Sequence, residues 1–168
     1  MKKLQIWIQA IRFYSFPASV VPVLITASIV YYQQTINWLY FFLVLCGVCF
    51  LHAATNLVND YYDYLNGYDT KKTLGSSGVL TGDLLRTEDV LAGIIVFYFM
   101  AILIGVFFVY QYGISVFSFL LVGFWGSYLY TGKPFSFKYN ALGELLVFLL
   151  MGPLLFAGIS LVLAGVVQ

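Results

Sequence analysis

A stripe of polar side chains interrupts one of the most hydrophobic stretches of this sequence. His52, Asn56, Asn59, Asp60 and Asp63 follow one another at spacings of one to four residues. On a helix, where successive residues are about 100° apart, these five side chains fall within an arc of about 100°. The residues between them are mostly apolar, so the stripe is expected to face a cavity or a neighbouring helix rather than lipid.

Asp60 and Asp63 could together bind a cation. A carboxylate near the hydrocarbon of a membrane is costly, so such residues usually face protein or water and mark a functional site. Two aspartates one turn apart also repel each other, and a cation between them would relieve this repulsion. Carboxylate and amide oxygens suit Mg²⁺, which often completes its shell with water and substrate phosphate. The alternative is a helix end that emerges into water and leaves both aspartates solvated.

The connection that follows, residues 64–89, carries groups that suit a phosphate. Loops of this length are usually lids, binding loops or linkers. Backbone N–H groups of the turn 75–78 and the side chains of Lys71, Lys72 and Arg86 could bind a diphosphate beside a metal. Each feature alone has an ordinary explanation, because Gly-Ser-Ser-Gly is a common turn and cytoplasmic loops are basic. Their position directly after the stripe favours the diphosphate.

A second polar connection, residues 131–142, precedes the last apolar run and carries Lys133. We expect Asn140 to cap the helix that follows, with Glu144 in its first turn, where the helix dipole favours an anion. A role for Glu144 in the site itself is the alternative.

Apolar helices are expected to position these groups. Hydrophobic residues make up 62% and charged residues 9% of the 168 residues, whereas soluble domains average about 45–50% and about 25%. This composition excludes an ordinary water-soluble globule, and the net charge of +1 leaves no basic surplus for binding nucleic acid. The uncharged runs are long enough for five spans of about 20 residues. The expected all-α transmembrane bundle has helices at roughly 14–32, 38–63, 90–110, 113–131 and 143–166.

The charges also predict an orientation. Five spans place the N-terminus and the connections 64–89 and 131–142 on one side, and this side holds all fifteen charged residues. Its lysines and arginines make it cytoplasmic by the positive-inside rule. We therefore expect an integral protein of the cytoplasmic membrane, with residues 4–12 forming an interfacial helix on the inner leaflet.

Other residues have structural interpretations. Cys46 and Cys49 form a Cys-x2-Cys pair without further ligands, so they are interpreted as packing residues. His52 is interpreted as a core residue that hydrogen-bonds to a neighbouring helix, with substrate contact as the alternative. Gly152 and Pro153 are expected to kink the last span.

Two stretches of the chain resemble a known family. The stretch 56–69, which begins Asn-Leu-Val-Asn-Asp-Tyr-Tyr-Asp, is similar to the first aspartate-rich motif of the UbiA superfamily of intramembrane prenyltransferases. The stretch 130–153, which holds Tyr-Thr-Gly-Lys-Pro, Gly-Glu and Gly-Pro, resembles the menaquinone branch, the 1,4-dihydroxy-2-naphthoate polyprenyltransferases. The resemblance implies a nine-helix bundle in which Mg²⁺ holds a polyprenyl diphosphate beside an aromatic acceptor.

The resemblance also assigns roles to individual residues. It places Asn56, Asp60 and Asp63 at the Mg²⁺-diphosphate site, as metal ligands and catalytic residues. Residues expected to contact substrate are Asn59, Asp69, Lys71, Lys72, Arg86, Tyr130 and Lys133. The implied reaction is transfer of a polyprenyl group in menaquinone biosynthesis. This reaction needs stabilisation of a departing diphosphate rather than a protein nucleophile, which agrees with the lack of a nucleophilic triad in the sequence.

The chain departs from the family pattern in one respect. A second aspartate-rich motif is expected near the sixth helix, but Glu144 is the only acidic residue after Asp89. Residues 1–168 are therefore expected to be a single domain that is C-terminally incomplete, either as a fragment or as a half-protein that needs a partner.

Other functions fit parts of the sequence. Another branch of the family would use 4-hydroxybenzoate or a different quinone or lipid acceptor. A phosphotransferase of the CDP-alcohol type also uses intramembrane aspartates, but its pattern needs Asp-Gly then Ala-Arg, whereas Tyr64 follows Asp63. An inactive fragment, a non-catalytic membrane subunit or a cation transporter remains as a further alternative, although carboxylates on one side only do not make a path across the membrane.

Overall fold

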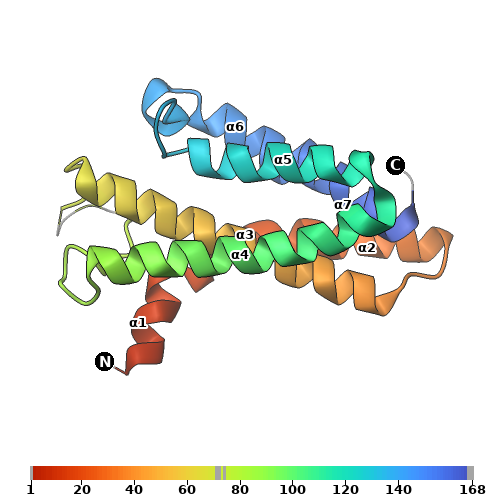
Figure 1. Cartoon of the computed structure of the whole chain (residues 1–168), viewed down its shortest axis with the longest axis horizontal. Helices are drawn as coiled ribbons and strands as arrows, with labels where there is room; N and C mark the ends of the chain where they lie inside the picture. The colour runs from red at the N-terminus through yellow and green to blue at the C-terminus, as the bar shows by residue number, and fades with distance from the viewer. Residues whose placement is uncertain (1, 71–72, 74, 166–168) are drawn as a thin grey trace.

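The computed structural model describes residues 2–70, 73 and 75–165, and all regular structure in these ranges is helical (Figure 1). This confirms the expected all-α bundle. In chain order the elements are α1 (Lys3–Ala10), η1 (Phe13–Ser15), α2 (Pro17–Gln33), α3 (Trp38–Leu65), α4 (Thr87–Tyr112), α5 (Ile114–Leu129), η2 (Phe137–Asn140), α6 (Gly143–Leu149), η3 (Leu150–Leu154) and α7 (Leu155–Ala164).

Four of the expected spans are long and apolar enough to cross a membrane, by length and composition. They are Phe13–Gln33, Trp38–Leu65, Thr87–Tyr112 and Gly143–Ala164. The fifth, expected at 113–131, is the shorter apolar helix α5 of 16 residues. Its length of about 24 Å falls below the hydrocarbon thickness of about 30 Å. Gly113, with a φ of 68°, reverses the chain directly before α5 and so fixes where this helix begins.

Helix α3 is the central element and carries the polar stripe. It begins at Asn37, whose side chain accepts hydrogen bonds from the backbone N–H groups of Leu39 (2.9 Å) and Tyr40 (3.3 Å). Its 28 residues span about 42 Å, which exceeds the hydrocarbon thickness of about 30 Å by about two turns. Helix α4 runs back along α3, and the polar stripe lies on the last turns of α3, towards one end of the bundle (Figure 1).

The last expected span is broken at Gly152 and Pro153, as the sequence predicts. Gly152 has φ −97° and ψ −108°, and residues Leu150–Leu154 form a π-turn between α6 and α7. Proline removes a backbone donor and glycine tolerates the distorted backbone, so the helix bends here. After the bend, α7 packs against α2, and the hydroxyl of Tyr112 donates to the carbonyl of Val162 at 2.7 Å.

The expected cap of this span is wrong. Helix α6 begins at Gly143 after Leu142, and no side chain caps it. Ala141 adopts a left-handed conformation, with a φ of 56°, and directs the chain away before α6 starts. Asn140 instead ends a 3₁₀ turn, where its Nδ2 donates to the carbonyl of Phe135 at 2.8 Å. Glu144 is exposed in the first turn of α6.

The connections gather at two ends of the bundle. The turn between α2 and α3 and the turn at Gly113 lie at one end, whereas α1, the α3–α4 connection and the α5–α6 connection lie at the other (Figure 1). The charged residues that the structure describes belong to this second end. Two apolar clusters stabilise the fold. One lies towards the first end around Val23, Val30 and Phe108, and the other packs beneath the polar stripe around Leu57 and Val90.

Helix α1 leaves the bundle and runs across the direction of the long helices (Figure 1). This fits the interfacial helix expected at 4–12, since Leu4 and Ile8 are exposed whereas Ala10 is buried. The indole of Trp7 anchors α1 against α4 at Gly93. A Cβ atom at Gly93 would lie 2.7 Å from Cζ3 of Trp7 and 3.1 Å from Cδ1 of Leu57. The absence of a side chain at Gly93 therefore allows α1 to dock.

Gly93→Ala should displace α1 and destabilise the protein. We expect a free energy of unfolding lower by about 1 kcal/mol, because the overpacking penalty exceeds the small gain in helix propensity. Denaturation in a detergent titration measures this change. The matched control is Gly123→Ala, whose Cβ would meet only side-chain atoms at 4.0 Å. Equal stability of the two variants would contradict the docking role of Gly93.

Candidate functional site

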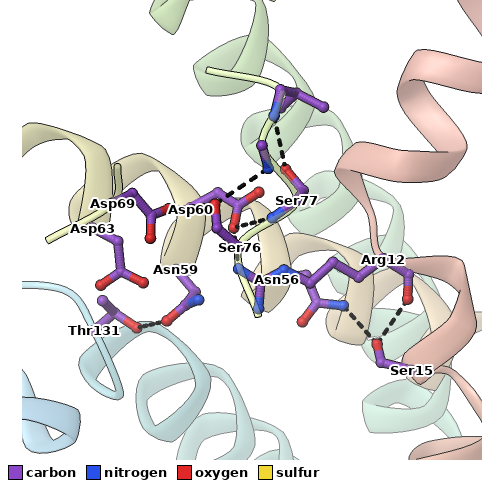
Figure 2. Close-up of polar contacts among 12 residues, drawn as sticks. Arg12, Ser15, Asn56, Asn59, Asp60, Asp63, Asp69, Ser76, Ser77 and Thr131 are labelled. Atoms are coloured by element: carbon purple, nitrogen blue, oxygen red, sulfur yellow. Dashed lines mark hydrogen bonds and ion pairs between the residues drawn. The ribbon is translucent and has the colours of Figure 1, made fainter. Parts of the chain in front are cut away.

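The polar stripe of α3 is buried between two segments from opposite parts of the chain. Asp60 is 2% exposed and Asp63 is 3% exposed, so neither is a solvated helix end. Figure 2 shows the stripe lying between Arg12 and Ser15 on one side and Thr131 on the other. The helical period and the burial together confirm that the stripe faces protein.

Asp60 is paired with Arg12, which lies between α1 and η1. The guanidinium Nη2 of Arg12 donates to Oδ1 of Asp60, and the backbone N–H of Ser77 reaches the same oxygen at 3.5 Å. Arg12 itself has left-handed backbone angles, φ 51° and ψ 54°, which bring its side chain back towards α3. Two polar atoms of this pair, Nε of Arg12 and Oδ2 of Asp60, are buried and have no hydrogen-bond partner among the described residues.

Asp63 is held from the other side by the α5–α6 connection. The Nζ of Lys138 donates to Oδ2 of Asp63 at 2.6 Å and to Oδ1 of Asn59 at 2.8 Å, and the hydroxyl of Tyr139 donates to Oδ1 of Asp63. Thr131 also donates to Oδ1 of Asn59, at 3.1 Å. Burial and the neighbouring Asp63 carboxylate raise the pKa of Tyr139 above its usual value, so its hydroxyl remains a donor at neutral pH.

The α3–α4 connection closes over Asp60. The hydroxyl of Ser76 donates to Oδ2 of Asp69 at 2.6 Å, and the side chain of Gln9 on α1 donates to the carbonyl of Ser77 at 2.7 Å. Val79 is fully buried against the apolar cluster beneath the stripe. These contacts hold the glycine-rich turn 75–78 over the carboxylate of Asp60. We call this turn the lid.

His52 ties the two N-terminal segments to α3. Its Nε2 lies 3.0 Å from Oγ of Ser15, and its Nδ1 lies 2.5 Å from Oγ of Ser19. The hydroxyl of Ser15 donates to the carbonyl of Arg12 at 2.8 Å, so Nε2–H of His52 must be the donor to Ser15. Nδ1 then accepts from Ser19. The core interpretation of His52 is confirmed by these contacts.

The same network orients Asn56. Its Nδ2 donates to the carbonyl of Ile11 at 2.8 Å. It also donates to Oγ of Ser15 at 3.1 Å (Figure 2). With Nδ2 held by these acceptors, Oδ1 of Asn56 is the group left to bind a ligand. The sequence does not reveal that Ser15, the partner of His52, is also a partner of Asn56.

His52→Phe should loosen this network. Phenylalanine keeps the ring but removes both nitrogens, which leaves the buried hydroxyl of Ser19 without its main partner. We expect a free energy of unfolding lower by about 1–3 kcal/mol. Detergent denaturation measures the change, and Phe50→Leu on the same helix is the comparison for altered ring packing. Unchanged stability in His52→Phe would show that the ring nitrogens contribute nothing.

The structure brings together only part of the expected site. Asn56, Asn59, Asp60 and Asp63 lie on one face, and Tyr130 is half-buried beside them, with its carbonyl accepting from the backbone N–H of Lys138 at 2.8 Å. Asp69 joins through the α3–α4 connection. Arg86 lies apart, exposed, and pairs with Asp89 at 3.3 Å; Lys133 is exposed as well. Lys71 and Lys72 lie outside the described residues.

The sequence prediction missed several side chains of the site. Arg12 and Lys138 supply its cations, and Thr131 and Tyr139 supply hydrogen bonds. In the sequence both cations count only as ordinary basic residues of cytoplasmic segments. Their distances along the chain from the aspartates, 48 and 75 residues, leave no periodic signal.

The donor atoms suit a hard divalent cation whose coordination shell is completed by a phosphate ligand. The stripe offers carboxylate and amide oxygens, and Oδ2 of Asp60 is a buried acceptor without a partner. Among the described residues no group of three or more His, Cys, Asp or Glu side chains could enclose a metal ion. The residues therefore fit a cation held by one or two carboxylates together with substrate, rather than an all-protein cage.

Comparison with known proteins identifies the family. Residues 19–167 match the UbiA prenyltransferase family. The chain is 32% identical over 148 residues to "1,4-dihydroxy-2-naphthoate octaprenyltransferase" of Bacillus subtilis (strain 168), covering 88% of this chain and 48% of that protein. It is 33% identical over 153 residues to "UbiA prenyltransferase domain-containing protein 1" of Homo sapiens, covering 88% of this chain and 44% of that protein.

The chain thus spans about half the length of the curated relatives it matches. The match nevertheless covers most of the chain, from the first turn of α2 through α7. Proteins of this family generally depend on a divalent metal, which agrees with the oxygen donors of the stripe. The chain belongs to the UbiA prenyltransferase family.

Proposed function

We propose that the chain forms the diphosphate-binding part of an intramembrane polyprenyltransferase. The donor is a polyprenyl diphosphate, the acceptor is an aromatic compound, 1,4-dihydroxy-2-naphthoate in the first instance, and the metal is Mg²⁺. The observation that carries the proposal is the buried pair Asp60 and Asp63, flanked by the cations of Arg12 and Lys138. Two buried carboxylates with a cation beside each suit a metal-bound polyanion.

The residues of the site support ionisation of the donor. The allylic C–O bond breaks and its electron pair leaves on the diphosphate, so developing negative charge must be stabilised. Bound Mg²⁺ would act as a Lewis acid towards the diphosphate oxygens. Arg12 and Lys138 add positive charge on either side. A pair of ring electrons of the acceptor then forms the new C–C bond to the allylic carbon, and the ring regains aromaticity when the attacking carbon releases the group it carried, as H⁺ or, from a carboxylated carbon, as CO2.

The lid over Asp60 supports the same chemistry by excluding water. An allylic cation reacts readily with water, so a productive site must keep water away from the reacting carbon. The turn 75–78 covers Asp60, and Val79 and Leu80 seal it against the apolar cluster beneath the stripe.

The orientation in the membrane is part of the proposal. The site lies at the end of the bundle that holds α1 and the charged connections (Figure 1). The lysines and arginines of this end support a cytoplasmic location, because positively charged connections usually remain on the cytoplasmic side of a membrane. Diphosphate and Mg²⁺ would therefore reach the site from the cytoplasmic side of the cell membrane.

Membranes containing the product of the complete reading frame test the function directly. They are supplied with a polyprenyl diphosphate, 1,4-dihydroxy-2-naphthoate and Mg²⁺, and the prenylated product is followed by chromatography. Product that requires both substrates and disappears with a metal chelator supports the proposal. Prenylation of 4-hydroxybenzoate instead would assign another branch of the family, and cation flux in liposomes without prenyl transfer would contradict an enzymatic role.

A further inference from the structure

We propose that Ser15 is a positioning residue, which holds the side-chain amide of Asn56 so that its oxygen, rather than its nitrogen, faces the bound metal. The inference rests on the proposed function and adds a residue that acts without touching metal or substrate. Ser15 lies in η1, between α1 and α2, whereas Asn56 lies in the stripe of α3. The hydrogen bond between them joins residues 41 positions apart in the chain.

The first argument is the direction of the hydrogen bonds at Ser15. A serine hydroxyl has one hydrogen to donate and two lone pairs with which to accept. The hydrogen of Ser15 goes to the carbonyl of Arg12 at 2.8 Å. Nε2 of His52 at 3.0 Å and Nδ2 of Asn56 at 3.1 Å then occupy the two lone pairs. The hydroxyl is saturated, so towards Asn56 it acts only as an acceptor.

The second argument is what an inverted amide would meet. An asparagine side chain has nearly the same shape in its two amide orientations, and its hydrogen-bond partners decide between them. At Asn56 both partners of Nδ2 are acceptors, the carbonyl of Ile11 at 2.8 Å and Oγ of Ser15. Inversion would place Oδ1 against two oxygens with no hydrogen between them. The chain itself therefore fixes the orientation of the amide before any ligand binds.

The third argument is the position of the amide oxygen. Asn56 and Asp60 are four residues apart on α3, so their side chains are neighbours on one face of the helix. Within the described part of the chain, the side-chain hydrogen bonds of Asn56 use Nδ2 alone, and Oδ2 of Asp60 is buried without a partner. Both oxygens are of the type that Mg²⁺ accepts. An inverted amide would present an NH₂ group, which cannot bind a cation.

The fourth argument is the support of Ser15 itself. Its partner His52 is buried on α3, and Nδ1 of His52 accepts from Ser19 of α2 at 2.5 Å. Ser15 is therefore held by α3 and by its own 3₁₀ turn as well as by Asn56. A partner supported in this way can orient a side chain that binds metal. Loss of such partners typically weakens metal binding by about 10–100-fold.

The test measures the Mg²⁺ requirement of ligand binding without turnover. Purified product of the complete reading frame is dialysed to equilibrium against radiolabelled inorganic pyrophosphate over a range of Mg²⁺ concentrations. For Ser15→Ala we expect the Mg²⁺ concentration at half-maximal pyrophosphate binding to rise about tenfold. Prenyl transfer in membranes should show the same rise, with the rate at saturating Mg²⁺ changed by less than about twofold. A purely structural role would lower the amount of competent protein, and so the maximum, without moving the half-saturating concentration.

Two further variants separate positioning from packing. Ser15→Thr keeps the hydroxyl and should restore the wild-type Mg²⁺ requirement. Ser127→Ala is the matched control, because Ser127 also donates to a backbone carbonyl, that of Phe124 at 2.8 Å, and also contacts a second side chain, the hydroxyl of Tyr98 at 3.0 Å. Its loss should lower stability and leave the Mg²⁺ requirement unchanged, since Asn56 is not among its partners.

The outcomes distinguish the inference from the proposed function. An unchanged half-saturating Mg²⁺ concentration in Ser15→Ala, an equal rise in Ser127→Ala, or no recovery in Ser15→Thr would overturn the inference and leave the proposed function intact. If Ser15→Ala does not fold, Ser15→Cys takes its place, because it is close in size and its sulfur is a weak acceptor; a wild-type Mg²⁺ requirement in Ser15→Cys would again overturn the inference. Failure of the wild type to bind pyrophosphate at any Mg²⁺ concentration would overturn both proposals.

Discussion

Asp60→Asn should lower the rate of prenyl transfer by about 10³-fold, because it removes a charged ligand where the leaving diphosphate is stabilised. The amide retains the size and hydrogen-bonding capacity of the carboxylate but not its charge. Asp60 is 2% exposed, so bulk water has little access to compensate for the missing carboxylate ligand. The rate is measured as product formed per minute in membranes at saturating Mg²⁺ and at saturating concentrations of both substrates.

Further substitutions at Asp60 distinguish the effect of its charge on activity from its effect on stability. Asp60→Ala leaves the guanidinium of Arg12 buried without a counter-ion, which should lower the free energy of unfolding by about 3–5 kcal/mol. The double variant Arg12→Met with Asp60→Leu should recover most of that stability but no activity. Asp83→Asn, an exposed aspartate of the α3–α4 connection, is the matched control for removal of one negative charge. Activity of Asp60→Asn equal to that of Asp83→Asn would rule out the assigned role.

Asp63→Asn should lower the rate by about 10²-fold and should also loosen the α5–α6 connection. The carboxylate accepts from both Lys138 and Tyr139, whereas an asparagine side chain has only one acceptor oxygen. One of these two hydrogen bonds must therefore be lost. Amide hydrogen exchange in residues 131–142 measures the loosening, and the assay described for Asp60 measures the rate.

Amide hydrogen exchange distinguishes an Asp63 that also holds the α5–α6 connection from an Asp63 that only binds metal. Exchange should rise in residues 131–142 of Asp63→Asn but not in those residues of Asp60→Asn, since Asp60 contacts Arg12 and Ser77 instead. Tyr139→Phe removes the second donor to Asp63 and should raise the same exchange with a smaller effect on rate. Equal exchange in all three proteins would mean that Asp63 does not hold the connection.

The stripe on α3 was predictable because a single helix carries it. Local spacing fixes the direction of each side chain, so the sequence alone places Asn56, Asp60 and Asp63 on one face. The spans were predictable for a similar reason, because apolar length decides whether a helix can cross a membrane. The kink at Gly152 and Pro153 also follows from local chemistry.

The partners of the stripe were not predictable because packing of distant segments decides them. Arg12 reaches Asp60 only because a left-handed residue turns the chain between α1 and η1. The expected cap at Asn140 is wrong for the same kind of reason, since the left-handed Ala141 shifts the start of α6. Arg86 is a residue type expected in a phosphate-binding loop, but it forms an ion pair with the nearby Asp89 and remains exposed.

The order in which the site's residues occur along the chain sets the order in which the site can be assembled during synthesis. Ribosomes extend the chain from the N-terminus, so Arg12 is already present when Asp60 emerges. Lys138 and Tyr139 emerge 75 and 76 residues after Asp63. Until then Asp63 lacks the partners that allow its burial, and the end of α3 should remain at the aqueous surface of the membrane. Insertion of α4 and α5 therefore precedes burial of Asp63, and the α5–α6 connection is the last of the described segments around the stripe to be made.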